Sequence, residues 1–392
     1  MGQAEGDQAE GDTDTAGRTF GVEEEFLLVA ADTGRPAAVA PRVLARASAQ
    51  GPPAPGAARQ AEMLTTQIEA ATGICTRSDE LREHLATARG GLAEVAAAEG
   101  ARLLSVGMPV LEGPPPPTTP TDRYERISDV YAGVVADYQA CGCHVHVGVP
   151  DRESAVAVVN RLRPWLPTLL AISVNSPFER GRDTGCHSWR MVAQSRFPGG
   201  GVPPWTGSQK EWDGRLGALV ECGVLMDERM TFWLARPSGH LPTVEVRAAD
   251  AALTVDEAVL QALLTRAMVR TALAEHREGR PEPVVRDVIA DAALWSAARY
   301  GLDGPGVDAV HERQVPAVWL VRDLLAWIRP ALEELGDLEE ARALLGAVTG
   351  AGTGALRQRT AAAGGGIRAV LDLLAESTSP GQAGEWGRKA GA

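Results

Sequence analysis

Apolar and polar residues alternate along several short stretches in the first two-thirds of the chain, and such alternation predicts strands with one buried face. The predicted strands cover residues 19–30, 62–72, 101–107, 139–149, 231–235 and 243–248. Between them, apolar residues spaced three and four apart predict helices that begin near Ser78, Thr121 and Asp151. From Asp256 onward nearly the whole chain has helical periodicity. This order of elements predicts an α+β fold.

The chain shows no internal repeat and no clear linker between two cores, so we predict a single domain over residues 18–380. Residues 1–17 are polar and acidic, which is typical of a disordered tail, and residues 381–392 are predicted to form a flexible C-terminal tail. Gly90-Gly91 disfavours helix and allows a break in the helix that begins at Ser78. The weakly patterned segment 175–212 is long enough to suggest a functional loop.

The composition of the chain argues against several classes of function. The net charge of -13 offers no basic surface for phosphates, so we expect no nucleic-acid partner. No apolar run reaches the length of a membrane span, and the N-terminus does not resemble a secretory signal. The five cysteines are scattered without a CxxC pair, which indicates a reducing, cytoplasmic environment. Whether the chain forms a homodimer stays open.

Three of the predicted strands carry side chains that bind divalent metals. Successive side chains of a strand point to opposite faces, so Glu23 and Glu25 share one face, as do His144 and His146. Glu245 lies in a third such strand. Burying a carboxylate costs several kcal/mol, as an order of magnitude, unless a cation or donor compensates it. If a sheet brings these strands together, their side chains form a metal cage.

Each segment alone has a simpler interpretation. The acidic run around Glu23 resembles a solvated strand edge, the two histidines resemble an ordinary pair, and Glu245 resembles a salt-bridge partner of Arg247. Their coincidence in one chain favours a metal site. Many carboxylates with few histidines favour Mg²⁺ or Mn²⁺ over zinc, and such ions commonly bind ATP phosphates. The sequence contains neither a GxxxxGK[ST] loop nor a GxGxxG motif after a strand, so ATP would bind through metal ions on a sheet.

Several motifs together resemble the carboxylate–amine ligase family, the glutamate–cysteine ligase type 2 group. The resemblance runs from about residue 19 to 378, and its motifs lie at 21–26, 141–148, 175–178, 181–185, 188–190, 242–247, 295–304 and 352–359. It implies a catalytic ligase domain with a curved, mainly antiparallel sheet, which forms a funnel-shaped active site with helices packed outside, as in glutamine synthetase and guanido kinases. It also implies that ATP activates a carboxylate as an acyl phosphate, which an amine then attacks to form an amide.

The resemblance assigns roles to particular residues. The metal ligands it implies are Glu23, Glu25, Glu62, Glu69, His144 and Glu245, and the arginines that hold the transferred phosphoryl group are Arg190 and Arg247. Glu62 and Glu69 are an odd number of residues apart, so a regular strand would need a bulge to place both on one face.

Three further residues are candidates for substrate binding: His146, Arg299 and Trp205. Trp205 lies in segment 197–212, which we consider a candidate donor or acceptor pocket. A surface role on a helix is the simpler interpretation of Arg299. Cys143, Cys186 and His187 depart from the residues common in the family.

The leading hypothesis is an ATP- and Mg²⁺-dependent ligase that joins glutamate, through its side-chain carboxylate, to an amino acid or amine. A metallohydrolase that uses His144 and His146 to bind a metal-activated water is an alternative. A catalytically silent relative with a binding role is a third.

Overall fold

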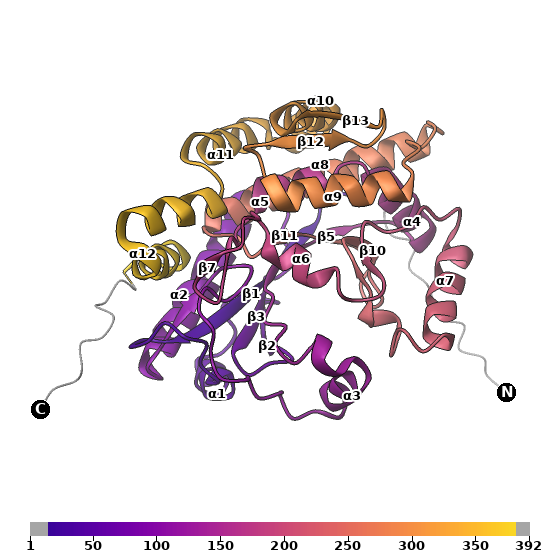
Figure 1. The fold of residues 1–392 in the computed structure, drawn as a ribbon. Helices are drawn as coiled ribbons and strands as arrows, with labels where there is room; N and C mark the ends of the chain where they lie inside the picture. The colour runs from indigo at the N-terminus through magenta and orange to yellow at the C-terminus, as the bar shows by residue number, and fades with distance from the viewer. Residues whose placement is uncertain (1–14, 382–392) are drawn as a thin grey trace, which may run out of the picture.

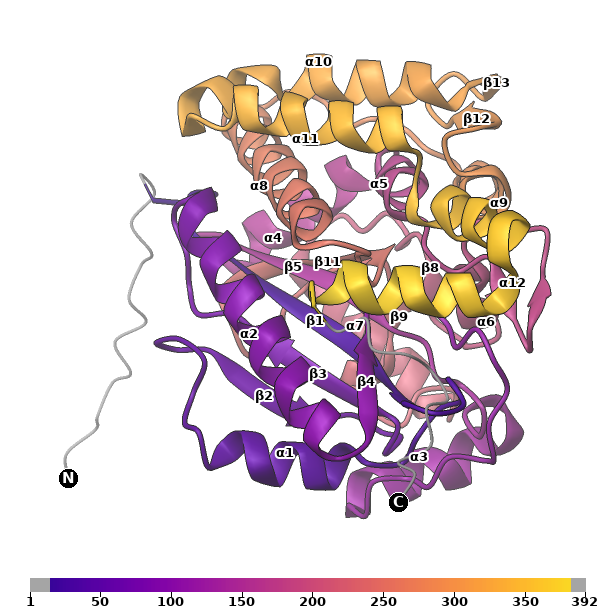
Figure 2. The ribbon, with the colours of Figure 1, turned by 90° about the vertical axis from the view of Figure 1, so that its left-hand side faces the viewer.

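Strands far apart in the sequence lie side by side in one antiparallel sheet (Figures 1 and 2). The computed structural model describes residues 15–381. The sheet contains β1 (Phe20–Ala30), β2 (Ala58–Ala61), β3 (Gln67–Ala71), β4 (Ala101–Leu104), β5 (Gly142–Gly148), β10 (Ala235–Pro237) and β11 (Thr243–Asp250). The strand order is β10-β11-β5-β1-β3-β2, and β4 also pairs with β1. The α+β class and the mainly antiparallel sheet are therefore as predicted.

Helices and short strand pairs surround this sheet. The helices are α1 (Ala40–Ser48), α2 (Ser78–Ala98), α3 (Asp122–Tyr131), α4 (Arg152–Leu162), α5 (Leu166–Ser173), α6 (Trp189–Gln194), α7 (Gln209–Glu221), α8 (Val255–Arg277), α9 (Asp287–Tyr300), α10 (Ala317–Leu335), α11 (Leu338–Ala351) and α12 (Gly354–Thr378). Two 3-10 turns, η1 (Ala132–Val134) and η2 (Glu228–Met230), and the pairs β6 (Phe178–Glu179) with β7 (Arg182–Asp183), β8 (Gly200–Gly201) with β9 (Phe232–Trp233) and β12 (Pro305–Asp308) with β13 (Arg313–Pro316) complete the fold. Helices α8 to α11 lie together above the sheet in Figures 1 and 2.

The central strand β1 shows how the chain separates its core from its polar face. Phe20 and Val22 pack with α4, α5 and α8 in the largest core cluster. Phe26 and Leu28 pack with α1 and α2 in a second cluster. Because side chains alternate along a strand, Glu23 and Glu25 face the other side of the sheet. The core thus fixes the position of the acidic face.

Some predicted elements differ from the observed ones. The predicted strand over 62–72 is instead the turn and the second strand of a hairpin, because β2 ends at Ala61 and β3 begins at Gln67. Helix α2 continues through Gly90-Gly91, since its buried side chains pack against the sheet and outweigh the low helix propensity of glycine. Segment 175–212 contains α6 and the short strands β6 to β8.

The predicted N-terminal tail over residues 1–17 extends too far along the chain, because residues 16 and 17 form hydrogen bonds with the domain. Residues 1–14 lie outside the described residues, but the Ala16 carbonyl accepts a hydrogen bond from Arg270 Nη1 at 2.8 Å. The Gly17 amide donates to the Gly148 carbonyl at 2.8 Å. At the other end, the predicted tail over 381–392 lies outside the described residues except for Gly381. The single domain over 18–380 stays a prediction.

Within residues 15–381, the structure contains no helix that combines the length and the apolar character needed to cross a membrane.

A buried ion pair fixes β1 to α2. Glu24 points to the face opposite Glu23, where Arg89 Nη2 donates to its Oε1 at 2.6 Å. Both side chains are almost completely buried. Arg89 Nη2 also donates to the Ala252 carbonyl at 2.8 Å, which links the loop after β11 to the same pair.

We expect Glu24→Gln to destabilise the protein strongly, because it leaves a buried guanidinium without a counterion. Breaking such a pair typically costs about 3–5 kcal/mol. Chemical denaturation should show a lower midpoint than for the wild type, while Glu94→Gln, an exposed residue of α2, should leave it unchanged. Equal midpoints for Glu24→Gln and the wild type would contradict this role.

Candidate active site

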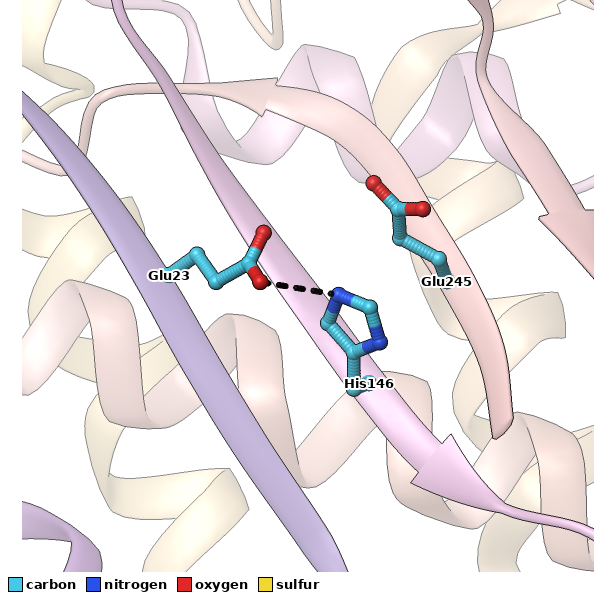
Figure 3. Close-up of side chains that lie close together, drawn as sticks. All are labelled: Glu23, His146 and Glu245. Atoms are coloured by element: carbon cyan, nitrogen blue, oxygen red, sulfur yellow. Dashed lines mark ion pairs between the residues drawn. The ribbon is translucent and has the colours of Figure 1, made fainter. Parts of the chain in front are cut away.

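The register of β1, β5 and β11 brings metal-binding side chains together on one face of the sheet. Glu23 lies opposite His144 in the β1–β5 pair, and His146 lies opposite Glu245 in the β5–β11 pair. Ligand atoms of Glu23, His146 and Glu245 all lie within 4.8 Å of one another. Figure 3 shows the two carboxylates on either side of the imidazole. We call these residues the first triad.

His146 is oriented as a metal ligand would be. Its Nδ1 is 3.0 Å from the Thr243 hydroxyl oxygen, which fixes the ring. Its Nε2 lies 3.4 Å from Glu23 Oε1 and has no hydrogen-bond partner among the described residues. A buried imidazole nitrogen directed at two carboxylates fits a bound cation, because its hydrogen-bonding capacity is otherwise unused.

The hairpin formed by β2 and β3 builds a second triad from Glu25, Glu62 and Glu69. Glu25 lies opposite Glu69 in the β1–β3 pair. Glu62 follows the end of β2, and the turn brings it back beside Glu69. Ligand atoms of the three residues lie within 4.8 Å of one another. The odd spacing therefore needs no bulge, because the two residues lie on the two sides of a turn.

The second triad concentrates negative charge that a divalent cation would neutralise. Burial, followed by the charge of Glu62, raises the pKa of Glu25 to about 8. Burial and the neighbouring carboxylates also raise the pKa of Glu69 well above its ordinary value, and burial raises that of Glu62. Carboxylates that resist ionising together are arranged as ligands of a hard cation. The oxygen-rich composition of this triad fits Mg²⁺ or Mn²⁺.

His144 lies between the two triads. Its Nδ1 is 3.7 Å from Glu23, and its Nε2 is 3.9 Å from Glu25. Burial, followed by the charge of Arg247, lowers its pKa to about 4, so the ring is neutral at pH 7. Among the described residues, His146 rather than His144 has the spacing of a ligand in the first triad, since Glu245 lies directly opposite His146.

Arginine side chains surround the first triad and extend from it into a cavity. Arg247 Nη1 donates to Glu245, two residues before it on β11. Arg236 of β10 donates from Nε to the other oxygen of Glu245 at 2.7 Å. Burial by itself would raise the pKa of Glu245, but the two guanidinium groups hold it well below its ordinary value. Arg190, on α6, is buried and also lines the cavity.

The cavity has a volume of about 320 Å³ and two unlike walls. The charged wall contains the second triad, His144, Arg190, Arg236 and Arg247. The other part of the lining is mostly apolar and comes largely from α3, η2 and the segments near them, with Tyr124, Ile127, Val135, Tyr138, Phe197, Met230 and Phe232, but it also includes Arg123 and Arg229. A cavity of this composition can hold a charged reacting centre on one side and an apolar group on the other.

None of the three predicted substrate-binding residues lines this cavity, and His146 belongs to the first triad instead. Trp205 is 48% exposed, and its indole nitrogen donates to Glu282 at 2.6 Å. Arg299 donates to the Gly185 carbonyl and lies over the Tyr300 ring. In segment 197–212, Phe197 lines the cavity, whereas Trp212 is buried against Trp233. The pattern of aromatic residues did not indicate which of them would face the site.

Several residues in or next to the site were missed from the sequence, among them Arg236 and Asp250. Arg236 lies in a short strand and has no distinctive motif, so only the pairing of β10 with β11 places it beside Glu245. Asp250 ends β11 within an otherwise apolar stretch, Ala248 to Leu253, and a lone carboxylate in such a stretch was a signal that could have been used.

Comparison with known proteins identifies the family. The model of glutamate-cysteine ligase family 2 (GCS2) matches residues 19–371. The chain belongs to this family. A candidate glutamate–cysteine ligase 2-2 of Saccharopolyspora erythraea is 55% identical over 368 residues, which are 94% of this chain and 94% of that protein. A candidate glutamate–cysteine ligase 2 of Salinispora arenicola is 42% identical and covers 94% of this chain and 97% of its own.

Solved structures support the same fold. Glutamate–cysteine ligase of Francisella tularensis, solved in complex with AMP, superposes with a TM-score of 0.68 at 14% identity, covering 94% of this chain and 89% of that chain. A bifunctional glutathione synthetase of Pasteurella multocida superposes with a TM-score of 0.64 at 15% identity, covering 92% of this chain and 51% of its own. The family prediction and the predicted fold class are confirmed. As a member of this family, the chain is an ATP-dependent, amide-forming ligase.

We expect Glu25→Gln to stabilise the metal-free protein at neutral and higher pH. The folded-state pKa of Glu25, about 8, exceeds its ordinary 4.5, so the carboxyl group contributes stability below pH 4.5 that is lost as the pH rises through 8. The neutral amide avoids that loss. The thermal midpoint of the variant, measured with a chelator, should equal that of the wild type near pH 4.5 and exceed it at pH 8.

Magnesium or manganese should reverse this order at pH 8 by stabilising the wild type more than the variant. Glu94→Gln serves as the exposed control and should match the wild type throughout. A constant difference between Glu25→Gln and the wild type across this pH range would contradict the assigned pKa.

Proposed function

We propose that this ligase joins the side-chain carboxylate of glutamate to an amino acid or amine through an acyl phosphate. The observation that carries the proposal is a cavity lined by the second triad, His144, Arg190, Arg236 and Arg247, where Arg236 and Arg247 also contact Glu245 of the first triad. Phosphoryl transfer depends mainly on positioning and charge neutralisation, and these side chains supply both.

The two steps place different demands on the site. In the first, a carboxylate oxygen attacks the terminal phosphorus of ATP and ADP leaves; in the second, the amine attacks the acyl carbon and phosphate leaves. The triads would hold Mg²⁺ or Mn²⁺, which neutralises phosphate charge when bound. Arg190 and Arg247 would orient the transferred phosphoryl group with their planar guanidinium groups. The neutral ring of His144 would add a buried polar contact between the triads.

The relatives support the choice of substrates. Their names describe glutamate–cysteine ligases, which favours glutamate as the donor and an amino acid such as cysteine as the acceptor. The AMP in the Francisella tularensis structure supports a nucleotide site in this fold. The apolar wall offers contact area for a nucleotide base or for an apolar acceptor side chain. The acceptor in this proposal is cysteine, another amino acid or a simple amine. We further propose a cytoplasmic location.

The direct test is ADP release by the purified protein with ATP and Mg²⁺, across an array of glutamate paired with single amines. We expect one or a few amines to stimulate ADP release and to yield an amide whose mass equals donor plus acceptor minus water. Amide hydrolysis without ATP, supported by a metal alone, would contradict the ligase and favour the metallohydrolase.

We expect Arg247→Lys to lower kcat by about 100-fold or more, because a point charge cannot replace a planar, forked donor at a phosphoryl group. The KM for ATP should change little. Arg152→Lys is a suitable control, since Arg152 also pairs with a carboxylate, Asp213, but does not line the cavity. Normal turnover by Arg247→Lys would remove Arg247 from the phosphoryl site.

A further inference from the structure

A fully buried carboxylate, Asp250, lies between the catalytic strand β11 and helix α6. It is the last residue of β11, the strand that also carries Glu245 and Arg247. Asp250 is five residues from Glu245, so a regular strand would turn it to the opposite face. A bulge between Val246 and Ala249 shifts the register, so Asp250 pairs with Gly142. Asp250 therefore lies on the same face of the sheet as His144.

Both oxygens of Asp250 accept hydrogen bonds. Oδ2 accepts from the Asn175 amide at 2.8 Å and from the Ser176 hydroxyl at 2.7 Å. Oδ1 accepts from the Ser188 hydroxyl at 2.8 Å. All of these partners are donors, which suits a carboxylate and not an amide, because an amide would place an NH₂ group against at least one of them.

The two serines transmit this anchoring to the first turn of α6. The Ser176 hydroxyl donates to Asp250 and accepts from the Arg190 amide at 3.1 Å. The Ser188 hydroxyl donates to Asp250 and accepts from the Met191 amide at 3.2 Å, as the N-cap of α6. The main chain that carries Arg190 is therefore fixed to the end of β11.

The guanidinium of Arg190 is also oriented from this side. Its Nη1 lies 3.8 Å from Asp250 Oδ1 and has no hydrogen-bond partner among the described residues. Its Nη2 donates to the Arg247 carbonyl at 3.3 Å. A Cβ at Gly142 would lie 2.5 Å from Nη2, so the glycine provides the space that the guanidinium occupies.

We propose that Asp250 is a positioning residue that holds Arg190 in register with Glu245 and Arg247, so that helix α6 and strand β11 present their side chains to the substrate as one unit. The inference rests on the proposed function, in which Arg190 contacts the transferred phosphoryl group. Asp250 itself does not line the cavity and acts through Arg190.

A double-mutant cycle on turnover tests this role. It compares the wild type, Asp250→Asn, Arg190→Ala and the double variant in amine-dependent ADP release. We expect Asp250→Asn to lower kcat about 10- to 100-fold with less than about a threefold change in the KM for ATP. In the Arg190→Ala background the same change should lower kcat by less than about threefold, since the residue it acts through is absent.

Glu24→Gln is the matched control, because Glu24 is equally buried and paired with an arginine but faces away from the cavity. Assayed at a temperature where it is folded, it should retain wild-type kcat despite its lower stability. Equal losses from Asp250→Asn in both backgrounds, or wild-type kcat for Asp250→Asn, would overturn the proposal.

If Asp250→Asn does not fold, Ser176→Ala takes its place in the cycle, because it removes the link to the Arg190 amide and keeps the carboxylate. Its loss of kcat should likewise vanish in the Arg190→Ala background, and a loss that persists there would overturn the proposal.

Binding separates this proposal from the proposed function. The same four proteins are titrated with Mn²⁺ and a non-hydrolysable ATP analogue by calorimetry. Wild-type affinity in Arg190→Ala would overturn both the role of Arg190 and the positioning role that depends on it. Weakened affinity in Arg190→Ala, with a full and independent further loss from Asp250→Asn, would overturn the positioning role alone.

Discussion

The repulsion among partly buried carboxylates on one face of the sheet is the constraint on which the rest of the site depends. Glu25, Glu62 and Glu69 lie within ligand spacing of one another, and burial raises the pKa of each. Such an arrangement persists in a folded protein only if the surrounding structure compensates its cost. A bound divalent cation would turn the same repulsion into affinity, and its binding would then stabilise the folded protein.

The two triads solve this electrostatic problem in different ways. In the first, Arg236 and Arg247 contact Glu245 and keep its pKa low, so that the carboxylate is ionised. In the second, no arginine forms an ion pair with the carboxylates among the described residues, and Arg190 and Arg247 balance their charges only from a longer distance. The second triad therefore has the greater need for a cation, and the first contributes a preformed ionic frame.

The other face of the sheet supplies the rigidity that the site requires. Apolar side chains of β1 pack into two core clusters on that face, against α1, α2, α4, α5 and α8. Along β1, each residue directed at the site thus has a neighbour directed at the core. Fixed strands matter here because metal ligands and phosphoryl-binding groups must keep their spacing to within fractions of an ångström.

The sequence by itself determined the local facts: that the segments of β1, β5 and β11 form strands, that Glu23 and Glu25 share a face, and that motifs of the ligase family are present. These follow from the period of two in a strand and from residue chemistry at fixed spacing. Only the tertiary structure decided which segments meet. The turn between β2 and β3 brought Glu62 to Glu69, the pairing of β5 with β11 chose His146 for the first triad, and the bulge in β11 turned Asp250 toward Arg190. Strand register and bulges arise from contacts between distant parts of the chain, and no local pattern encodes them.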